Sequence, residues 1–146
     1  MSFGFYMRKT FFLILISLFI FGCSEEEKVL EVMNTEAFAF RLNGGWELNA
    51  TALVKGFEQL EEEDKYTAKL SYSIDLVPPS SDTLREIDYG LVDLNNDDEI
   101  TDIPVEVQIE FDSTFTTGEY FVIFNITDDL SEQEVKAAEQ FQLTEE

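Results

Sequence analysis

Apolar and polar residues alternate along most of the chain after residue 35, as they do in strands with one buried and one solvated face. The alternation is clearest in the segment after Lys65, whose apolar positions are Tyr66, Ala68, Leu70, Tyr72, Ile74 and Leu76. Similar patterns predict further strands over 35–42, 46–52, 87–94, 105–111, 121–127 and 135–143. No segment has the period of a long helix. We therefore expect about seven antiparallel strands.

Short polar segments separate these strands. Asn43-Gly44-Gly45 predicts a tight turn, because these residues accept positive φ without steric cost. Pro78-Pro79 ends the strand before it, because proline cannot donate to a strand ladder. Between the second and third strands we expect a helical turn over 56–60 and then a charged loop over 61–64. Apolar residues on both faces of 121–127 predict a central strand that is covered on both sides.

A series of short strands separated by turns is typical of an all-β sandwich. A chain of this length can bury about two-thirds of its unfolded surface, which suits one globular domain over residues 35–146. Gly118 and Tyr120 resemble the Gly-x-Tyr entry to the penultimate strand of immunoglobulin-like and related bacterial domains. The resemblance implies an immunoglobulin-like antiparallel β-sandwich in which the Tyr120 hydroxyl bonds back to a neighbouring backbone group. A half-buried strand tyrosine is the alternative.

The longest apolar run, Thr10 to Phe21, precedes this pattern. Arg8 and Lys9 lie before it and the small residue Gly22 follows, which is the layout of a secretory signal peptide over residues 1–22. Met7 is an alternative start. A membrane-spanning helix needs about 20 apolar residues, whereas this run ends at a cluster of carboxylates that hydrocarbon would exclude. Export is therefore the favoured interpretation.

Ile20-Phe21-Gly22-Cys23 resembles the bacterial lipobox, although Phe21 replaces the usual small residue. The resemblance implies cleavage between Gly22 and Cys23 and attachment of lipid, including palmitate, to Cys23. Cys23 is the only cysteine of the chain, so it has no partner for an internal disulfide. Cleavage by the ordinary signal peptidase, with Cys23 incidental, is the alternative.

The acidic segment Ser24-Glu25-Glu26-Glu27 resembles the export signal that follows the lipid-bearing cysteine in surface lipoproteins of the Bacteroidota. The resemblance implies a protein anchored in the outer membrane by its lipid and facing the cell exterior. Residues 23–34 would then be an acidic tether. A solvated linker without a sorting role is the alternative, because Glu-rich segments are commonly linkers.

The chain is strongly acidic, with 31 Asp and Glu, nine Lys and Arg, and a formal net charge of −22. Nucleic acid is excluded as a partner, because phosphate binding depends on Lys and Arg. Adsorption to anionic head groups is disfavoured for the same reason. High charge is also typical of disordered chains, but 14 Phe, five Tyr and one Trp provide enough apolar surface for a core.

One acidic run has the spacing of metal ligands. Asp93, Asn95, Asp97 and Glu99 resemble the opening of an EF-hand calcium loop. The pattern departs from that motif at Asp98, where glycine is required, and at Pro104, where the bidentate glutamate belongs. These four residues are therefore a candidate for weak calcium binding, and an acidic hairpin loop is the alternative. No other cofactor is expected.

Two short motifs resemble the O-glycosylation acceptor of the Bacteroidota, with Thr83 and Ser113 as the acceptor residues. We name no catalytic residue and do not expect an enzyme, because the chain has no histidine and no free cysteine after the signal peptide. A small hydrolase that uses two carboxylates stays an alternative.

The sequence thus predicts a lipid-anchored envelope protein that acts as a non-catalytic binding or structural module. Its ligand would be an unidentified protein or a polysaccharide. Phe121 and Trp46 are the aromatic residues that we expect to stack on a sugar if the ligand is a polysaccharide. A large exposed apolar patch would instead favour a protein as the ligand. A periplasm-facing accessory subunit of an outer-membrane assembly, which would co-purify with specific partners, is the alternative function.

Overall fold

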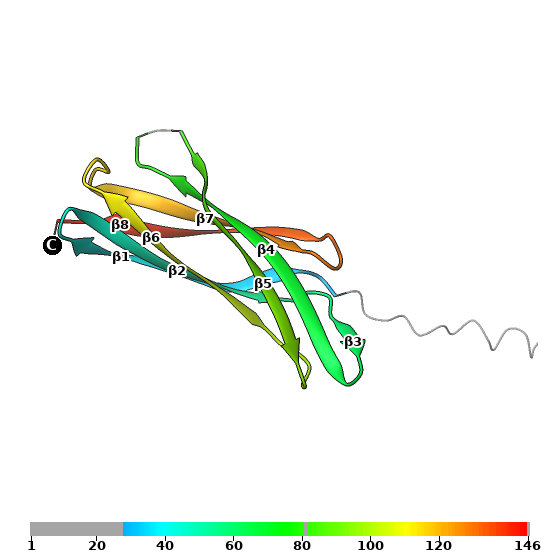
Figure 1. The fold of residues 1–146 in the computed structure, drawn as a ribbon. Helices are drawn as coiled ribbons and strands as arrows, with labels where there is room; N and C mark the ends of the chain where they lie inside the picture. Colours follow the sequence, from blue (N-terminus) through cyan, green and yellow to red (C-terminus); the bar gives the residue numbers. More distant parts are fainter. Residues whose placement is uncertain (1–27, 81, 146) are drawn as a thin grey trace, which may run out of the picture.

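The computed structural model describes residues 28–80 and 82–145, and it folds them into two antiparallel sheets that pack face to face (Figure 1). The all-β sandwich expected from the sequence is confirmed. The described residues contain no helix that could cross a membrane. The strands are β1 (Glu31–Leu42), β2 (Gly45–Lys55), β3 (Leu60–Glu62), β4 (Lys65–Val77), β5 (Leu84–Asn96), β6 (Ile103–Asp112), β7 (Gly118–Asp128) and β8 (Glu134–Leu143).

The strand order is immunoglobulin-like. The first sheet has the order β1-β2-β6, and in the second sheet β4 pairs with β5 on one side and with β7 on the other, followed by β8. In immunoglobulin constant domains strands A, B, E and D share one sheet and strands C, F and G the other. The two sheets reproduce this division except for the strand between C and E, here β5, which pairs with β4 and not with the first sheet. The short β3 extends the pairing of β4 at its beginning.

The core consists of the alternate residues that the two sheets turn toward each other. The predicted strand after Lys65 behaves as expected, because Ala68, Leu70, Ile74 and Leu76 are fully buried in β4. Burying each of the three larger side chains, Leu70, Ile74 and Leu76, contributes roughly 1.5–3 kcal/mol. The other fully or nearly fully buried side chains include Leu48, Ala52, Val54, Phe57, Ile103, Val105, Tyr120, Val122, Phe124, Ile126 and Leu143.

The tyrosine corner predicted from Gly118 and Tyr120 is present. The Tyr120 hydroxyl donates a hydrogen bond to the backbone oxygen of Thr116 at 2.8 Å, and only 1% of the residue is exposed. Its ring stacks on Phe141, with centroids 5.5 Å apart. The backbone hydrogen bond predicted for the Tyr120 hydroxyl is therefore confirmed, and the alternative of an ordinary half-buried tyrosine is wrong.

The segment that enters the sandwich is ordered earlier than the predicted tether boundary at residue 34. β1 begins at Glu31, which pairs with Lys55 of β2. The backbone N–H of Leu30 donates to the side chain of Gln133 at 3.1 Å, and Leu30 itself is buried. Two apolar residues of the predicted tether are therefore part of the sandwich: Leu30 is buried in the core, and Val32 pairs with Val54 of β2 and packs against the core.

The helical turn predicted over 56–60 is wrong. Gly56 has φ +71°, and a Cβ there would lie 1.8 Å from the backbone oxygen of Val29, so the chain bends where it passes another segment closely. Phe57 then enters the core and Leu60–Glu62 forms β3. Part of the predicted charged loop is therefore a strand, and only Glu63 and Asp64, both with positive φ, form the turn.

One further expectation is wrong, and it concerns the outer face of the second sheet. The strand over 121–127 was predicted to be covered on both faces, but the outward residues Phe121, Ile123 and Asn125 of β7 are not buried, since the described residues form only two layers. In β5 the inward residues are Val92 and Leu94, while Tyr89 and Leu91 project outward and are 79% and 78% exposed.

Candidate binding groove

A groove of about 810 Å³ lies on the outer face of the second sheet, over β4, β7 and β8, with β5 along one side. One row of directly paired residues crosses it. Tyr89 on β5 pairs with Ser73 on β4, Ser73 pairs with Asn125 on β7, and Asn125 pairs with Lys136 on β8. Directly paired residues project to the same face of a sheet, so the register alone brings these four side chains into one line.

A second row runs beside the first. Ser71 on β4 pairs with Thr127 on β7, and Thr127 pairs with Glu134 on β8. The floor of the groove is thus made of small polar side chains, two on β4 and two on β7. Because these side chains are short, they rise little above the sheet, and the groove is the space above them between β5 and β8. All seven residues of the two rows line the groove.

The floor contains an unsatisfied polar atom. Among the described residues, Asn125 Oδ1 is the buried side-chain atom without a hydrogen-bond partner, while its Nδ2 donates to the Ser73 backbone oxygen at 3.4 Å. The Ser71 hydroxyl donates to Asp129 at 2.7 Å. An unpartnered buried acceptor is uncommon in folded proteins because its desolvation is not compensated.

Tyr89 forms the aromatic side of the groove. Its position depends on Gly90, the next residue of β5, which points inward. A Cβ at Gly90 would lie 2.4 Å from the Tyr72 hydroxyl, so Tyr72 fills the space that a side chain there would need. Burial, and then the nearby Asp88 carboxylate, raise the pKa of Tyr72 above its usual value. With Tyr72 packed inward, the Tyr89 ring is left outside and open to solvent.

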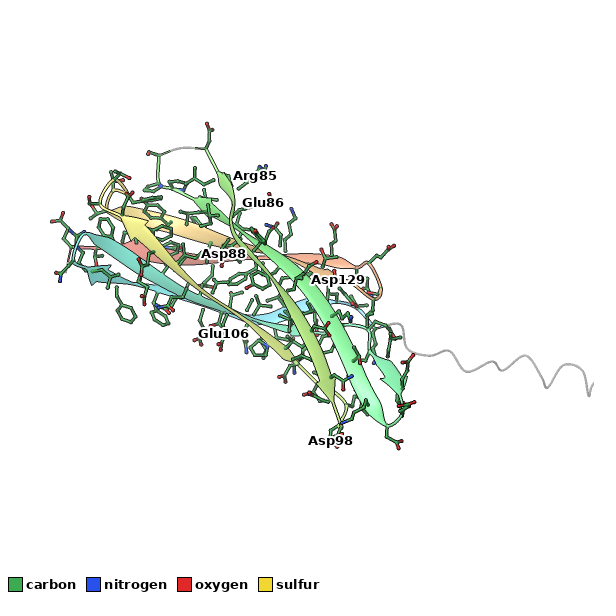
Figure 2. All side chains as sticks on the ribbon, viewed as in Figure 1. Arg85, Glu86, Asp88, Asp98, Glu106 and Asp129 are labelled. Atoms are coloured by element: carbon green, nitrogen blue, oxygen red, sulfur yellow. The ribbon has the colours of Figure 1, made fainter. Side chains whose placement is uncertain are left out.

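A break in the pairing of β4 and β5 forms one end of the groove. The register shifts between Ile74 and Leu76, and the backbone N–H of Glu86 donates to the carboxylate of Asp75 at 2.9 Å. Asp75 is only 6% exposed, and Glu86 has φ +51°. Figure 2 shows Arg85 and Glu86 near the beginning of β5, and both line the groove.

The aromatic residues selected from the sequence for sugar stacking do not form this site. Trp46 is 4% exposed, its Nε1–H donates to the Thr144 backbone oxygen at 2.8 Å, and the Arg41 guanidinium lies 4.3 Å above its ring. Phe121 is 38% exposed and projects from the same sheet face, but it does not line the groove. The exposed aromatic residue of the groove is Tyr89.

The residues of the predicted calcium loop are not gathered around one point. Asp93 forms an ion pair with Lys69 at 3.3 Å, and Glu99 lies 3.9 Å from Lys28. Asp97 is paired with Lys65, and Asn95 donates to the Thr67 hydroxyl at 2.9 Å. Within residues 28–80 and 82–145 there is no group of three or more His, Cys, Asp or Glu side chains placed to hold a metal ion.

The two candidate glycosylation residues lie at strand ends. Ser113 is exposed in the β6–β7 turn, where the preceding Asp112 carboxylate accepts from the backbone N–H of Thr114 at 2.8 Å. The hydrogen bonds from Thr114 lower the pKa of Asp112. Thr83 lies just before β5 and is half-buried. Ser113 is therefore the more accessible of the two candidates.

Gly22 and Cys23, the residues assigned to signal cleavage and lipidation, lie outside the described residues, as does most of the acidic tether. No protein-family model matches the chain, and no curated protein is significantly similar to it.

Proposed function

We propose that this protein is a lipid-anchored cell-envelope protein whose sandwich domain binds saccharide without catalysis. The observation that carries the proposal is the row Tyr89, Ser73, Asn125 and Lys136, which places an exposed aromatic ring beside a floor of hydrogen-bonding side chains. A sugar ring offers an apolar face to an aromatic ring and hydroxyl groups to polar side chains. A few fixed polar groups beside an aromatic surface are typical of sites for small ligands.

The anchor is the second part of the proposal. Lipid on Cys23 holds the domain at the outer membrane, and the acidic residues after it support display toward the cell exterior. The same location gives the groove access to saccharides of the surroundings. The strongly negative surface of the domain adds no attraction to anionic lipid, so the acyl chains must supply the membrane affinity.

The groove is tested by replacing Tyr89 with alanine and measuring binding to a panel of immobilised glycans. We expect the variant to lose roughly three- to tenfold in affinity, the size of an aromatic contact. Phe40→Ala is the matched control, because Phe40 is also an exposed aromatic strand residue, 55% exposed, but lies on β1 in the other sheet. Equal binding by both variants and the unaltered protein would contradict the proposed site.

The anchor is tested by replacing Cys23 with alanine. We expect loss of metabolic lipid labelling and release of the protein from the membrane fraction. Added protease should digest the unaltered protein on intact cells if the domain faces outward. Protection on intact cells, with digestion after lysis, would show that the domain faces the periplasm instead.

A second function, docking to another protein as an accessory subunit, is favoured by a different surface. Phe38, Phe40 and Leu42 project along the outer face of β1 and are 49%, 55% and 41% exposed. The two Phe rings contact each other edge to face, with centroids 5.2 Å apart. The combined Phe38→Ser and Phe40→Ser variant should lose specific envelope proteins that co-purify with the unaltered chain, while keeping its glycan binding.

A further inference from the structure

The cations of this acidic protein are distributed unevenly. Most basic side chains of the described chain have a partner: three lysines are in ion pairs, with Glu99, Asp97 and Asp93, and Arg41 lies over the ring of Trp46. Lys55, Arg85 and Lys136 have no ion pair within the part of the chain that the structure describes. Two of these three, Arg85 and Lys136, line the groove.

The two unpaired cations of the groove, Lys136 and Arg85, occupy different borders of it. Lys136 is on β8 and ends the row that begins with Tyr89, and Arg85 stands at the break between β4 and β5. Neighbouring strands lie about 4.8 Å apart, so three strand spacings put Lys136 about 14 Å from Tyr89 at the backbone. That length accommodates a short run of sugar rings, with one ring on Tyr89 and a later ring beside Lys136.

Acidic groups also line the groove, but they form no ion pairs with Arg85 or Lys136 in the described structure. Asp75 is occupied by the hydrogen bond from the Glu86 backbone and is buried beneath it. Glu86 and Glu134 are exposed at the border, where water and salt screen their charge. Neither carboxylate forms an ion pair with Arg85 or Lys136 in the described structure. Both cations therefore remain available to a ligand.

We infer that the saccharide bound in the groove carries anionic groups, carboxylates or sulfates, of which Lys136 holds one at its border and Arg85 another at the break between β4 and β5. This inference rests on the proposed function, because it names the class of saccharide for the same site. The guanidinium group matches planar and tetrahedral oxyanions with two parallel hydrogen bonds, whereas the ammonium group acts as a point charge. Tyr89 and the polar floor recognise the sugar ring, and the two cations select the charged ring.

The test uses the full chain and an array of neutral, uronate-bearing and sulfated glycans. We expect the strongest binding among the charged classes, and the array shows which of the two anions is preferred. The best charged oligosaccharide is then compared with its neutral derivative, in which each carboxyl group is reduced to an alcohol or each sulfate is removed. The charged form should bind about two- to fivefold more tightly for each cation that it engages.

Two variants identify the cations responsible. Lys136→Gln and Arg85→Gln should each lower the affinity for the charged form by a larger factor than the affinity for its neutral derivative, so that part of the preference for the charged form is lost. Lys55→Gln removes the same charge from an unpaired lysine outside the groove, so it is the matched control and should keep the preference. Raising the salt concentration from about 0.05 M to about 0.5 M should weaken the preference in the unaltered protein.

Each other outcome has a distinct meaning. Tight binding of neutral glycans alone would overturn the inference and leave the proposed function intact. A preference for charged glycans that survives in the Lys136→Gln, Arg85→Gln double variant would overturn the assignment of these residues. Absence of binding to every glycan class would overturn the proposed function together with the inference. Both side chains are exposed, so the substitutions should leave the fold unchanged, and the unfolding midpoint measures this.

Discussion

The carboxylate of Asp128 accepts a hydrogen bond from the backbone N–H of Glu58 at 2.7 Å, although 70 residues separate them in the sequence. The same carboxylate accepts from the Ser131 hydroxyl at 2.6 Å and from the Leu130 N–H at 3.0 Å. Asp128 is fully buried. One side chain therefore ties the segment after β2 to the β7–β8 hairpin, at the end of the sandwich where β1 begins.

Replacing Asp128 with alanine should lower the free energy of unfolding by about 3 kcal/mol, because three part-buried donors lose a charged acceptor. Asp128→Asn is the control, since its amide oxygen can still accept from part of the set, and it should be less destabilising. Urea unfolding followed by fluorescence of Trp46 measures both values. A loss below about 0.5 kcal/mol in the alanine variant would show that the network does not stabilise the domain.

Replacing Tyr120 with phenylalanine removes the hydrogen bond to the Thr116 backbone oxygen but keeps the ring that stacks on Phe141. We expect a loss of about 1 kcal/mol in stability, the net value of one such bond. Tyr120→Ala should cost about 3–5 kcal/mol, because it also leaves a cavity in the core. Denaturant unfolding of the two variants separates the hydrogen bond from the packing. Similar losses in both would contradict this division.

Two neighbouring glycines of the β1–β2 turn should respond differently to alanine. A Cβ at Gly45 would lie 1.8 Å from the backbone oxygen of Phe111, so Gly45→Ala must separate β2 from β6. Gly44 has φ +112° but nothing lies within 4 Å of its Cβ position, so Gly44→Ala meets only backbone strain. We expect a loss of about 1 kcal/mol at Gly44 and a clearly larger loss at Gly45. The reverse order of thermal midpoints would contradict the pairing of β2 with β6.

The raised pKa of Tyr72 predicts a dependence on alkaline pH. Burial and Asp88 both disfavour the phenolate, so the folded state keeps the proton at a pH where the unfolded chain releases it. The resulting stabilisation of the neutral form is complete below pH 10, the ordinary value, and is lost as pH rises through the raised pKa. Asp88→Asn should lower the pKa of Tyr72. Following the NMR resonance of the Tyr72 ring as a function of pH measures its pKa in both proteins, and an equal pKa in the two would contradict the role of Asp88.

The acidic run of β5 should not bind calcium at millimolar concentration. Asp93 and Asp97 are paired with lysines, and the alternating side chains of a strand do not converge on one point. Calorimetric titration with calcium is therefore expected to show no heat of binding. Heat that disappears in the Asp93→Asn, Asp97→Asn double variant would instead establish the calcium site proposed from the sequence.

Most of the fold could be predicted from the sequence because the alternation of apolar and polar residues within each strand shows which face is buried. The alternation of Ala68, Leu70, Ile74 and Leu76 identifies β4 and its buried face without knowledge of any partner. The Gly118 and Tyr120 motif was likewise local, since the hydroxyl reaches a backbone oxygen only four residues away. The register of β5 could not be read in this way. Leu91 and Val92 are adjacent and both apolar, and Gly90 has no side chain to indicate the inward face.

The groove was not predictable for a related reason. Tyr89, Ser73, Asn125 and Lys136 come from four strands, and none belongs to a sequence motif. They share a row only because β4, which forms a hairpin with β5, also pairs with β7, a strand that follows in the sequence only after β5 and β6. The strongest local signal is the pair of small polar residues Ser71 and Ser73 on the solvated face of β4, and such residues are equally typical of an ordinary surface.

The sequence by itself determined the strand-forming segments, the inward faces of most of them, the tyrosine corner, and the predictions of export and lipidation at Cys23. These depend on the order of residues within short segments, which the chain carries in any conformation. The tertiary structure alone decided which strands are neighbours, that Trp46 is buried and Tyr89 exposed, and that Arg85 and Lys136 border one groove. Those relationships depend on strand pairing, which joins residues as far apart in the sequence as Gly45 and Asp112 and leaves no pattern in the local sequence.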